Sequence, residues 1–371
     1  MSDNYSIIIK NGSCYINGKF QTTDIGIIGD KIKKIGNINH EGSKIFDASN
    51  KIVLPGVIDT QVHFREPGAN DAENLESGSR AAVAGGVTSV FEMPNTNPPT
   101  STFQEFNKKL EAAKNRMFCN YAFYFGATPN NMKELATVDT LKGCCGVKLF
   151  AGSSTGNLLV SQEKDIEKVI SNSSKIISVH SEDENILLSR KKYIKDGDVH
   201  SHPIWRNEDC ALESTKRVVR IAQKYKKKIH ILHVTTKQEI DFFTEKRDNV
   251  TFEITPQHLT IYAPDCYDNL KTFSQMNPPL RSKDHYDRLW DAVNESLVST
   301  IGSDHAPHTK EEKNRKYPLS PSGMPGVQTL LPVMLDHVNK GKLKIEKLIK
   351  LVCENPCDLF GIKNKGYIKE N

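Results

Sequence analysis

The 371-residue sequence has no CxxC pair among its eight cysteines, and it has no apolar run of about 18 residues that could span a membrane. Scattered cysteines argue against a zinc ribbon or a thioredoxin-type motif and fit reduced, buried thiols. Fifty Lys and Arg against 45 Asp and Glu leave a net charge of +5, too small to indicate a nucleic-acid-binding surface. The N-terminus lacks the features of a secretory signal. These absences predict a cytoplasmic protein that binds neither nucleic acid nor membrane.

Residues 1–52 are predicted to form a small β-domain. The stretch IIIKNGSCYINGKF contains two Asn-Gly pairs between apolar runs, a pattern typical of β-hairpins. The stretch DIGIIGDKIKKIG repeats the pattern. Residues 53–345 are predicted to form a second, larger domain, and residues 346–371 a C-terminal helix and tail.

Eight short apolar runs, most of them separated by helix-like segments, occupy the second domain. Alternating strands and helices indicate a parallel sheet, and eight strands over roughly 250 residues fit a (β/α)₈ TIM-type barrel. A doubly wound open sheet is the alternative, although no GxGxxG fingerprint follows the early strands. The runs cover residues 57–63, 88–94, 120–126, 146–150, 176–180, 229–233, 251–255 and 300–304.

Five of these runs carry a chemically competent side chain at or near their ends. In a barrel all strand C-termini meet at one face, where active sites lie. Each side chain alone fits an ordinary core or surface role, but chance placement at five strand ends is improbable. Three imidazoles and one carboxylate from different strands suit a divalent metal such as zinc. The five residues are His63, Lys148, His180, His233 and Asp304.

Lys148 is unexpected in a metal cluster, because an ammonium group repels a metal cation. A neutral lysine amine that has captured carbon dioxide would instead be an anionic carbamate, whose two oxygens can bridge two metals. The alternative is a solvated or ion-paired lysine. The apolar run GVKLF around Lys148 disfavours that alternative.

Nine motifs follow one another from about residue 52 to residue 335: LPGVIDTQVHFREPG, TSVFEMPNTNPPT, GVKLFAGSSTGNLLV, VHSEDE, ILHVTT, EITPQHL, NPPLR, TIGSDHAPHT and SPSGMPGVQTLLPVML. In this order they resemble the dihydroorotases of the amidohydrolase superfamily. The combination of REPG, EMPNT and SDHAPH is the specific part of the resemblance. Hydantoinases and allantoinases share the metal cluster but not the whole set.

The resemblance implies a cyclic amidohydrolase that reversibly hydrolyses dihydroorotate to carbamoyl aspartate in pyrimidine biosynthesis. It implies one or two Zn²⁺ ions per chain. His63 and Asp304 would bind one metal, His180 and His233 would bind the other, and carbamylated Lys148 would bridge both. Asp304 would also transfer the proton. The partner is expected to be a small-molecule substrate, and the resemblance is consistent with a homodimer. The residues implied in substrate binding are Arg65, Asn95, Asn277, His308 and Gly323.

Two departures from the family pattern bear on activity. The family opens its metal site with His-x-His, whereas this chain has Gln61-Val62-His63. A neutral amide oxygen is a poor zinc ligand compared with imidazole, so the first metal position is expected to be weak or empty. The chain also ends at KGYIKEN, where family members continue into strands that complete the small β-domain. That domain is therefore expected to be incomplete.

Three functions remain open at this point, of which an active dihydroorotase is preferred. The others are a catalytically impaired homologue that acts as a partner-binding scaffold, and a related hydantoinase- or allantoinase-type hydrolase. Metal content separates the first from the second. Substrate charge separates the first from the third, because Arg65, Asn95 and His308 call for an anionic substrate. An ion pair with Glu66 or Asp71 is the structural alternative for Arg65.

Overall fold

A computed structural model of the chain describes residues 4–39, 44–154, 158–245 and 248–370. The chain divides into two units, of which one comprises residues 1–58 and 343–371 and the other residues 59–342. Residues 155–157, which belong to the GVKLFAGSSTGNLLV motif, lie outside the described part. No helix in the described ranges is long and apolar enough to cross a bilayer.

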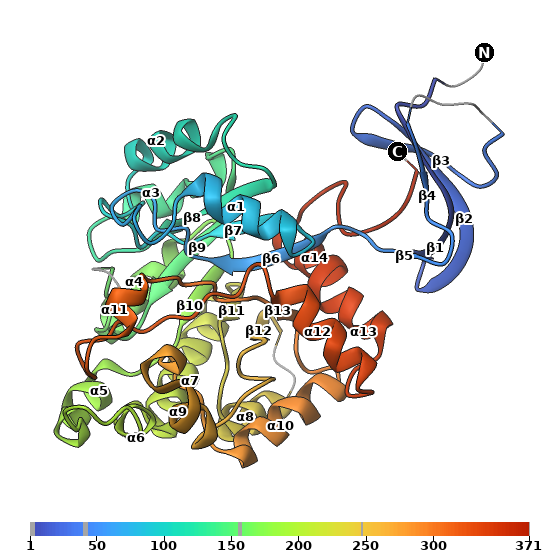
Figure 1. Cartoon of the computed structure of the whole chain (residues 1–371). Helices are drawn as coiled ribbons and strands as arrows, with labels where there is room; N and C mark the ends of the chain where they lie inside the picture. Colours follow the sequence, from blue (N-terminus) through green and yellow to red (C-terminus); the bar gives the residue numbers. More distant parts are fainter. Residues whose placement is uncertain (1–3, 40–43, 155–157, 246–247, 371) are drawn as a thin grey trace. The chain divides into compact units, whose positions relative to one another are not determined.

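The first unit holds a mixed five-stranded sheet in the order β3-β2-β1-β4, with β5 paired to β1 (Figure 1). Strands β1 and β2 are antiparallel. Asn17 and Gly18 join them with positive φ angles of 49° and 80°, as a two-residue hairpin turn requires. The strands are β1 (Ile7–Ile16), β2 (Lys19–Ile28), β3 (Lys31–Ile35), β4 (Ile45–Asp47) and β5 (Ile52–Val53).

The other Asn-Gly pair, Asn11-Gly12, lies inside β1 and does not form a turn. The β1–β2 register shifts between Ile9 and Gly12, and Asn11 has a φ of 60°. A left-handed residue at a register shift is a β-bulge, which bends a strand without ending it. The prediction of a hairpin is therefore confirmed at the second pair and wrong at the first.

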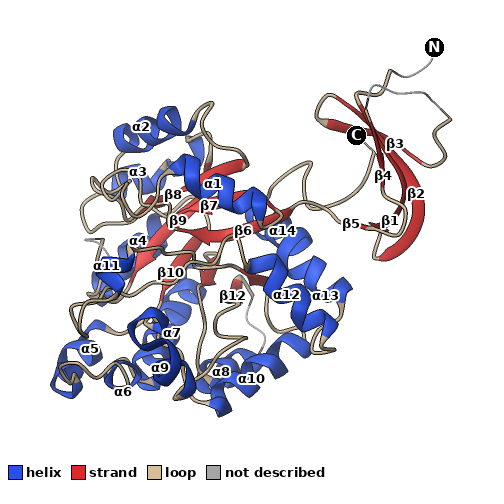
Figure 2. Cartoon of the chain, in the orientation of Figure 1, coloured by secondary structure: helices blue, strands red, loops and turns tan. Residues whose placement is uncertain are grey.

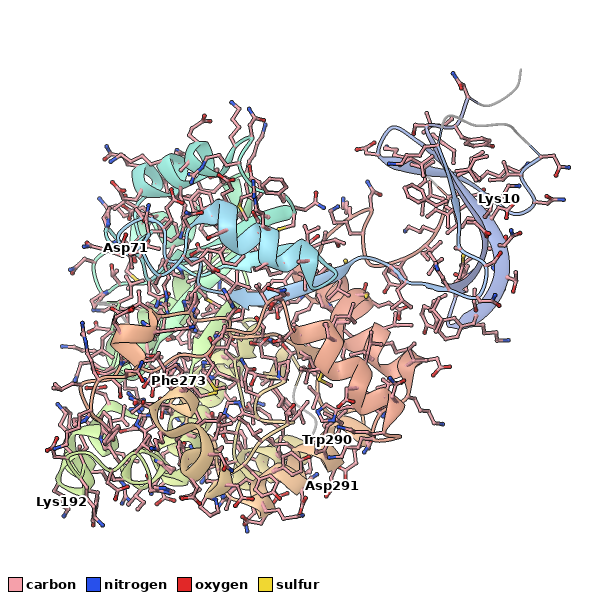
Figure 3. All side chains as sticks on the ribbon, in the orientation of Figure 1. Lys10, Asp71, Lys192, Phe273, Trp290 and Asp291 are labelled. Atoms are coloured by element: carbon pink, nitrogen blue, oxygen red, sulfur yellow. The ribbon has the colours of Figure 1, made fainter. Side chains whose placement is uncertain are left out.

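The C-terminal residues lie against this sheet. Ile368 packs in an apolar cluster with Cys14, Ile16 and Ile25, and Glu370 Oε1 accepts a hydrogen bond of 2.7 Å from the backbone N–H of Ile35 in β3. On β1, Lys10, labelled in Figure 3, pairs with Asp24 at 3.0 Å. The segments before these residues are α13 (Ile345–Ile349), a π-helical turn (Lys350–Glu354) and α14 (Asn355–Phe360).

The second unit is built on eight parallel strands in sequence order from β6 to β13. The cylinder closes because Val62 bridges His305 and the His63 N–H donates to the His305 carbonyl at 2.7 Å. Closure confirms the TIM-type barrel and excludes the open sheet, and each of the eight predicted runs falls on one strand. The strands are β6 (Val57–Val62), β7 (Val87–Glu92), β8 (Asn120–Gly126), β9 (Cys144–Phe150), β10 (Ile177–His180), β11 (Ile229–Ile231), β12 (Val250–Ile254) and β13 (Thr300–Ile301).

Helices surround the barrel strands, as Figure 2 shows in blue and red. Capping residues fix where several helices begin: Asn74 and Ser77 form a capping box on α1, and Thr236 and Glu239 form one on α8. The helices of this unit are α1 (Leu75–Ala84), α2 (Phe103–Ala113), α3 (Met132–Ala136), α4 (Glu163–Asn172), α5 (Glu184–Arg190), α6 (Ser201–Trp205), α7 (Glu208–Tyr225), α8 (Lys237–Thr244), α9 (Asp265–Leu270), α10 (Lys283–Asn294), α11 (Lys310–Lys313) and α12 (Leu330–Asn339), with 3₁₀ turns η1 (Val138–Thr140), η2 (Lys191–Tyr193) and η3 (Lys271–Ser274).

Candidate active site

One pocket gathers the predicted site residues at the C-terminal ends of the barrel strands. Gln61, Phe150, Ser154, Ala306 and Ser322 also line it. These residues cluster because the parallel strands that carry them end at one face of the barrel. Their individual roles in catalysis or binding stay predictions. Of the predicted residues, the pocket lining includes His63, Arg65, Asn95, Lys148, His180, His233, Asn277, Asp304 and Gly323, and leaves out His308.

Three of these residues have left-handed backbone conformations. The φ angles are 61° at Arg65, 37° at His233 and 45° at Asp304. Such conformations cost a non-glycine residue about 1–3 kcal/mol and persist where surrounding contacts hold them, often at active sites. The barrel therefore fixes these three side chains at the pocket against a local preference of the chain.

His63 and Asp304 form the first pair of potential metal ligands. His63 Nε2 lies 3.2 Å from Asp304 Oδ1, and His63 Nδ1 lies 2.8 Å from Asn95 Oδ1. Burial, together with the charges of Arg65 and Lys148, lowers the pKa of His63. A neutral ring that donates from Nδ1 to Asn95 presents its Nε2 lone pair toward Asp304. Asn95 therefore contacts an imidazole, a role that the resemblance does not assign to it.

His180 and His233 form the second pair. His180 Nδ1 lies 3.1 Å from His233 Nε2, and His180 Nε2 lies 2.9 Å from Glu182 Oε2. Burial lowers the pKa of both imidazoles. Because Nε2 of His180 donates to Glu182, its Nδ1 turns a lone pair toward the facing ring. Two imidazole nitrogens in this arrangement converge on one point.

Glu182 and Arg206 are site residues that sequence reasoning missed. Burial alone would raise the pKa of the Glu182 carboxyl, but Arg206 and His180 hold it at about 2. Arg206 Nη1 binds the same Glu182 oxygen that faces His180, and Arg206 Nη2 donates to the Ser153 carbonyl at 2.6 Å. The sequence offers one signal for Glu182, because its carboxylate stands two residues after the predicted ligand His180. Arg206 follows α6 and has no local signal.

Lys148 is only 1% exposed, and its Nζ lies 4.5 Å from the centre of the Phe150 ring. This burial contradicts the solvated alternative. Burial also lowers the pKa of Lys148 to about 7, although Asp304 and Glu253 act in the opposite direction. A substantial share of the side chain is therefore neutral amine at neutral pH. The neutral amine is the form that can add to carbon dioxide.

The two pairs fit a metal centre if a further ligand, shared between them, is available. Two ligands at about 2.0–2.1 Å from a tetrahedral ion lie roughly 3.3 Å apart, close to the 3.2 Å between His63 and Asp304 and the 3.1 Å between His180 and His233. Each pair supplies two donors, and no three His, Cys, Asp or Glu residues of the described chain are placed to hold a metal. Lys148 lines the same pocket and is the candidate for a shared third donor, which requires the carbamate because an ammonium group would repel cations.

Gln61 occupies the position where the family pattern has an imidazole. Its Nε2 donates to Asp304 Oδ1 at 2.8 Å. Its Oε1 is buried without a hydrogen-bond partner in the described part of the chain. The side chain therefore gives Asp304 a hydrogen-bond donor and leaves an amide oxygen available at the pocket.

Arg65 lines the pocket and lies beside His308, which is outside the pocket lining. Arg65 Nε donates to the Pro307 carbonyl at 2.9 Å, and Nη2 lies 3.1 Å from His308 Nε2. The predicted alternative of an Arg65–Glu66 ion pair is wrong, because Glu66 pairs with Arg116 at 2.8 Å. Burial and Arg65 lower the pKa of His308 to about 4, so this imidazole is neutral and the positive charge here is that of the guanidinium.

A second hollow adjoins the pocket and shares Arg65 and Asn95 with it. His308 and Asp71 also line this hollow, and the Asp71 label in Figure 3 marks the loop after Arg65. Arg65 therefore stands where the pocket meets the hollow.

Asn277 and Gly323 come from two further loops that line the pocket. Asn277 Oδ1 lies 3.0 Å from Nε2 of the buried His202. Gly323 has a φ of 148°, and a Cβ at this position would lie 2.4 Å from the Ala306 carbonyl oxygen. Only glycine fits there, so the loop approaches Ala306 closely.

A closed (β/α)₈ barrel with these side chains at its strand ends defines the class as a TIM-barrel amidohydrolase. The match to the amidohydrolase family covers residues 52–371, and the chain belongs to this family. Among curated relatives, the dihydroorotase of Methanosarcina mazei is 34% identical over 97% of this chain and 82% of its own length. The dihydroorotase of Thermococcus kodakarensis is 31% identical over 97% of this chain and 81% of its own length.

Solved structures with the same fold include hydantoinases. L-hydantoinase (dihydropyrimidinase) from Arthrobacter aurescens superposes with a TM-score of 0.93 at 28% identity, covering 98% of this chain and 84% of that chain. A D-hydantoinase superposes with a TM-score of 0.89 at 22% identity, over 98% of this chain and 84% of that one, which supports the fold alone.

Proposed function

We propose that the chain is a zinc-dependent dihydroorotase that reversibly hydrolyses the cyclic amide of dihydroorotate to carbamoyl aspartate. The observation that carries the proposal is Arg65, a guanidinium that is 7% exposed and lines the pocket. Guanidinium binds carboxylate through two parallel charge-assisted hydrogen bonds. Dihydroorotate carries such a carboxylate on its ring. The similarity to curated dihydroorotases supports the same substrate.

The residues that would hold zinc are His63 and Asp304 on one side and His180 and His233 on the other, joined by carbamylated Lys148. Zinc, when bound, lowers the pKa of a water toward ~7 and polarises the amide carbonyl that is to be cleaved.

Asp304 is the group placed to move the proton. Burial raises the pKa of its carboxyl, which makes the ionised group a stronger base than an exposed aspartate, while a bound cation would act in the opposite direction. Gln61 donates to its Oδ1 and so orients the carboxylate. In hydrolysis Asp304 accepts the proton of the attacking water and passes it to the ring nitrogen that leaves. In ring closure Asp304 accepts the proton of the attacking ureido nitrogen and passes it to the oxygen that leaves.

Arg65 orients the ring by holding its carboxylate. Its Nε donates to the Pro307 carbonyl, which holds the guanidinium at the pocket before substrate arrives. A prepositioned guanidinium loses little side-chain entropy on binding. This geometry favours a substrate with a carboxylate beside the cleaved amide.

A hydantoinase-type hydrolase is the second candidate, because the L-hydantoinase fold superposes closely on this chain. A neutral hydantoin or dihydropyrimidine ring offers no partner for the Arg65 charge. A catalytically impaired scaffold is the third reading, and Gln61 is the residue that motivates it. The complete set of other pocket residues favours an enzyme over a scaffold.

The test is metal analysis of the purified protein together with a dihydroorotate hydrolysis assay. We expect at least one zinc per chain, turnover of dihydroorotate, loss of turnover with a chelator and recovery on adding zinc. The Asp304→Asn variant, purified in parallel, controls for a contaminating enzyme. Zinc-loaded protein that leaves dihydroorotate unchanged would contradict the proposal.

A further inference from the structure

Lys313, the last residue of α11, is a buried lysine whose ammonium group faces three backbone carbonyls. Its Nζ donates to the carbonyl oxygens of Gln275 at 3.1 Å, Pro321 at 2.9 Å and Gly323 at 3.0 Å. The residue is 5% exposed. Burying an ammonium group is costly unless its donors are satisfied, and three carbonyls match its three donors. We call this arrangement the lysine clamp.

The clamp joins two loops that line the pocket. Gln275 lies between η3 and Asn277, while Pro321 and Gly323 belong to the loop after α11. Asn277, Ser322 and Gly323 all line the pocket. The two loops are far apart in sequence, so neither fixes the other through chain connectivity. The lysine side chain provides one anchor common to both.

Further hydrogen bonds show that the two loops meet as a defined structure. Gln275 Nε2 donates to the Ser320 carbonyl and to Ser322 Oγ, both at 3.0 Å, and the N–H of Gly323 donates to the Gln275 carbonyl at 2.9 Å. Lys313 itself is fixed from the η3 side, because Thr272 Oγ1 donates to its carbonyl at 2.6 Å. Phe273, labelled in Figure 3, marks this η3 segment.

The clamp also places positive charge next to Gly323, which lines the pocket. Its three acceptors are neutral, so they satisfy the donors of Lys313 without cancelling its charge. Burial and the charge of Arg65 lower the pKa of Lys313 to about 8, which leaves it largely protonated at neutral pH. Lys313 and Arg65 together therefore attract an anion to this side of the pocket.

We propose that Lys313 is a positioning and specificity-determining residue, which fixes the Asn277 and Gly323 loops and adds positive charge that favours an anionic ring substrate. The effect on substrate rests on the proposed dihydroorotase function. The effect on the loops does not depend on which substrate the protein takes. The effect on substrate and the effect on the loops can therefore be measured separately.

The experiment compares Lys313→Met with Lys310→Met in the zinc-loaded, full-length protein. Lys310 lies on the same short helix but is exposed, so its variant removes an equal charge without touching the clamp. For Lys313→Met we expect the KM for dihydroorotate to rise about tenfold or more, since a charged hydrogen-bond network is lost, with kcat within about threefold. Lys310→Met should leave both values within about twofold.

Amide hydrogen exchange supplies the readout that needs no substrate. In Lys313→Met we expect faster exchange in residues 272–278 and 319–324 and unchanged exchange in the barrel strands. Lys313→Arg keeps the charge, but a planar guanidinium cannot meet all three carbonyls. It should therefore show the same faster exchange with a smaller rise in KM. If Lys313→Met does not fold, the hydrogen exchange and KM of Lys313→Arg test the proposal instead.

Unchanged hydrogen exchange in both loops of Lys313→Met would contradict the proposed role of Lys313. A KM increase in Lys310→Met equal to that in Lys313→Met would contradict it as well. A parent protein that does not turn over dihydroorotate would instead contradict the proposed function. In that case the exchange comparison still tests the clamp.

Discussion

The amide Nε2 of Gln61 lies 2.8 Å from Oδ1 of Asp304, which places a hydrogen-bond donor where the family pattern has an imidazole ligand. Asp304 is thereby oriented without a metal, and His63 faces the same carboxylate oxygen. The metal position proposed at these residues therefore has one nitrogen ligand fewer than the family pattern. The position proposed at His180 and His233 has both of its imidazoles.

Replacing Gln61 with histidine is expected to strengthen the first metal position. Imidazole is a far better zinc ligand than a carboxamide, so bound metal should rise toward two ions per chain and turnover should increase. Added zinc should help the parent protein more than the variant. Gln61→Ala, which removes the amide and adds no ligand, is the matched control and should show no gain. A second bound metal without any increase in turnover would place the limit on activity elsewhere.

Lys148→Ala is expected to abolish turnover and lower zinc content, because it removes the side chain proposed to supply a shared anionic ligand to both pairs. Short carboxylic acids should restore part of the activity by replacing the bridge. Lys142→Ala, at an exposed position just before β9, is the control and should behave as the parent. Normal turnover with two metals in Lys148→Ala would disprove the carbamate.

Arg65→Met is expected to raise the KM for dihydroorotate at least tenfold and to leave metal content unchanged. The reason is the loss of charge-assisted hydrogen bonds worth about 1.5–3 kcal/mol. Steady-state kinetics with parallel zinc analysis measures both effects. Arg80→Met, which removes an exposed helical arginine paired with Glu76, is the control. An unchanged KM would make Arg65 a structural residue.

The proton-transfer role of Asp304 predicts that hydrolysis is lost as the pH falls. Burial raises the pKa of this carboxyl, whereas zinc bound at the same carboxylate would lower it. Hydrolysis needs the ionised base, so its rate in zinc-loaded protein should fall with decreasing pH and level at higher pH. Steady-state kinetics across the pH range, with zinc content measured at each pH, checks this. A rate that stays constant on acidification would remove Asp304 from the proton transfer.

The barrel and the clustering of the site could be predicted from the sequence because both follow from local patterns. Each strand is a short apolar run, and parallel strands of a barrel end at one face. This rule places His63, Lys148, His180, His233 and Asp304 together without any knowledge of tertiary contacts.

Contacts between distant loops could not be predicted in this way. Arg206, which follows α6, donates a hydrogen bond to Glu182. Lys313, at the end of α11, donates one to the backbone carbonyl of Gln275 in another loop. The residues next to Arg206 and Lys313 in the sequence do not distinguish these two side chains from exposed ones. The bulge at Asn11-Gly12 was missed for a different reason, because a positive-φ residue serves a turn and a bulge equally well.

The buried guanidinium of Arg65 is expected to make the pocket select a ring with a carboxylate. A comparison of kcat/KM for dihydroorotate and for dihydrouracil, which is the same ring without the carboxylate, on one preparation of zinc-loaded protein tests this selectivity. The Arg65 geometry predicts a preference for dihydroorotate of at least about tenfold, which Arg65→Met should reduce. Equal or faster hydrolysis of dihydrouracil would contradict this selectivity and assign the chain to the hydantoinase type.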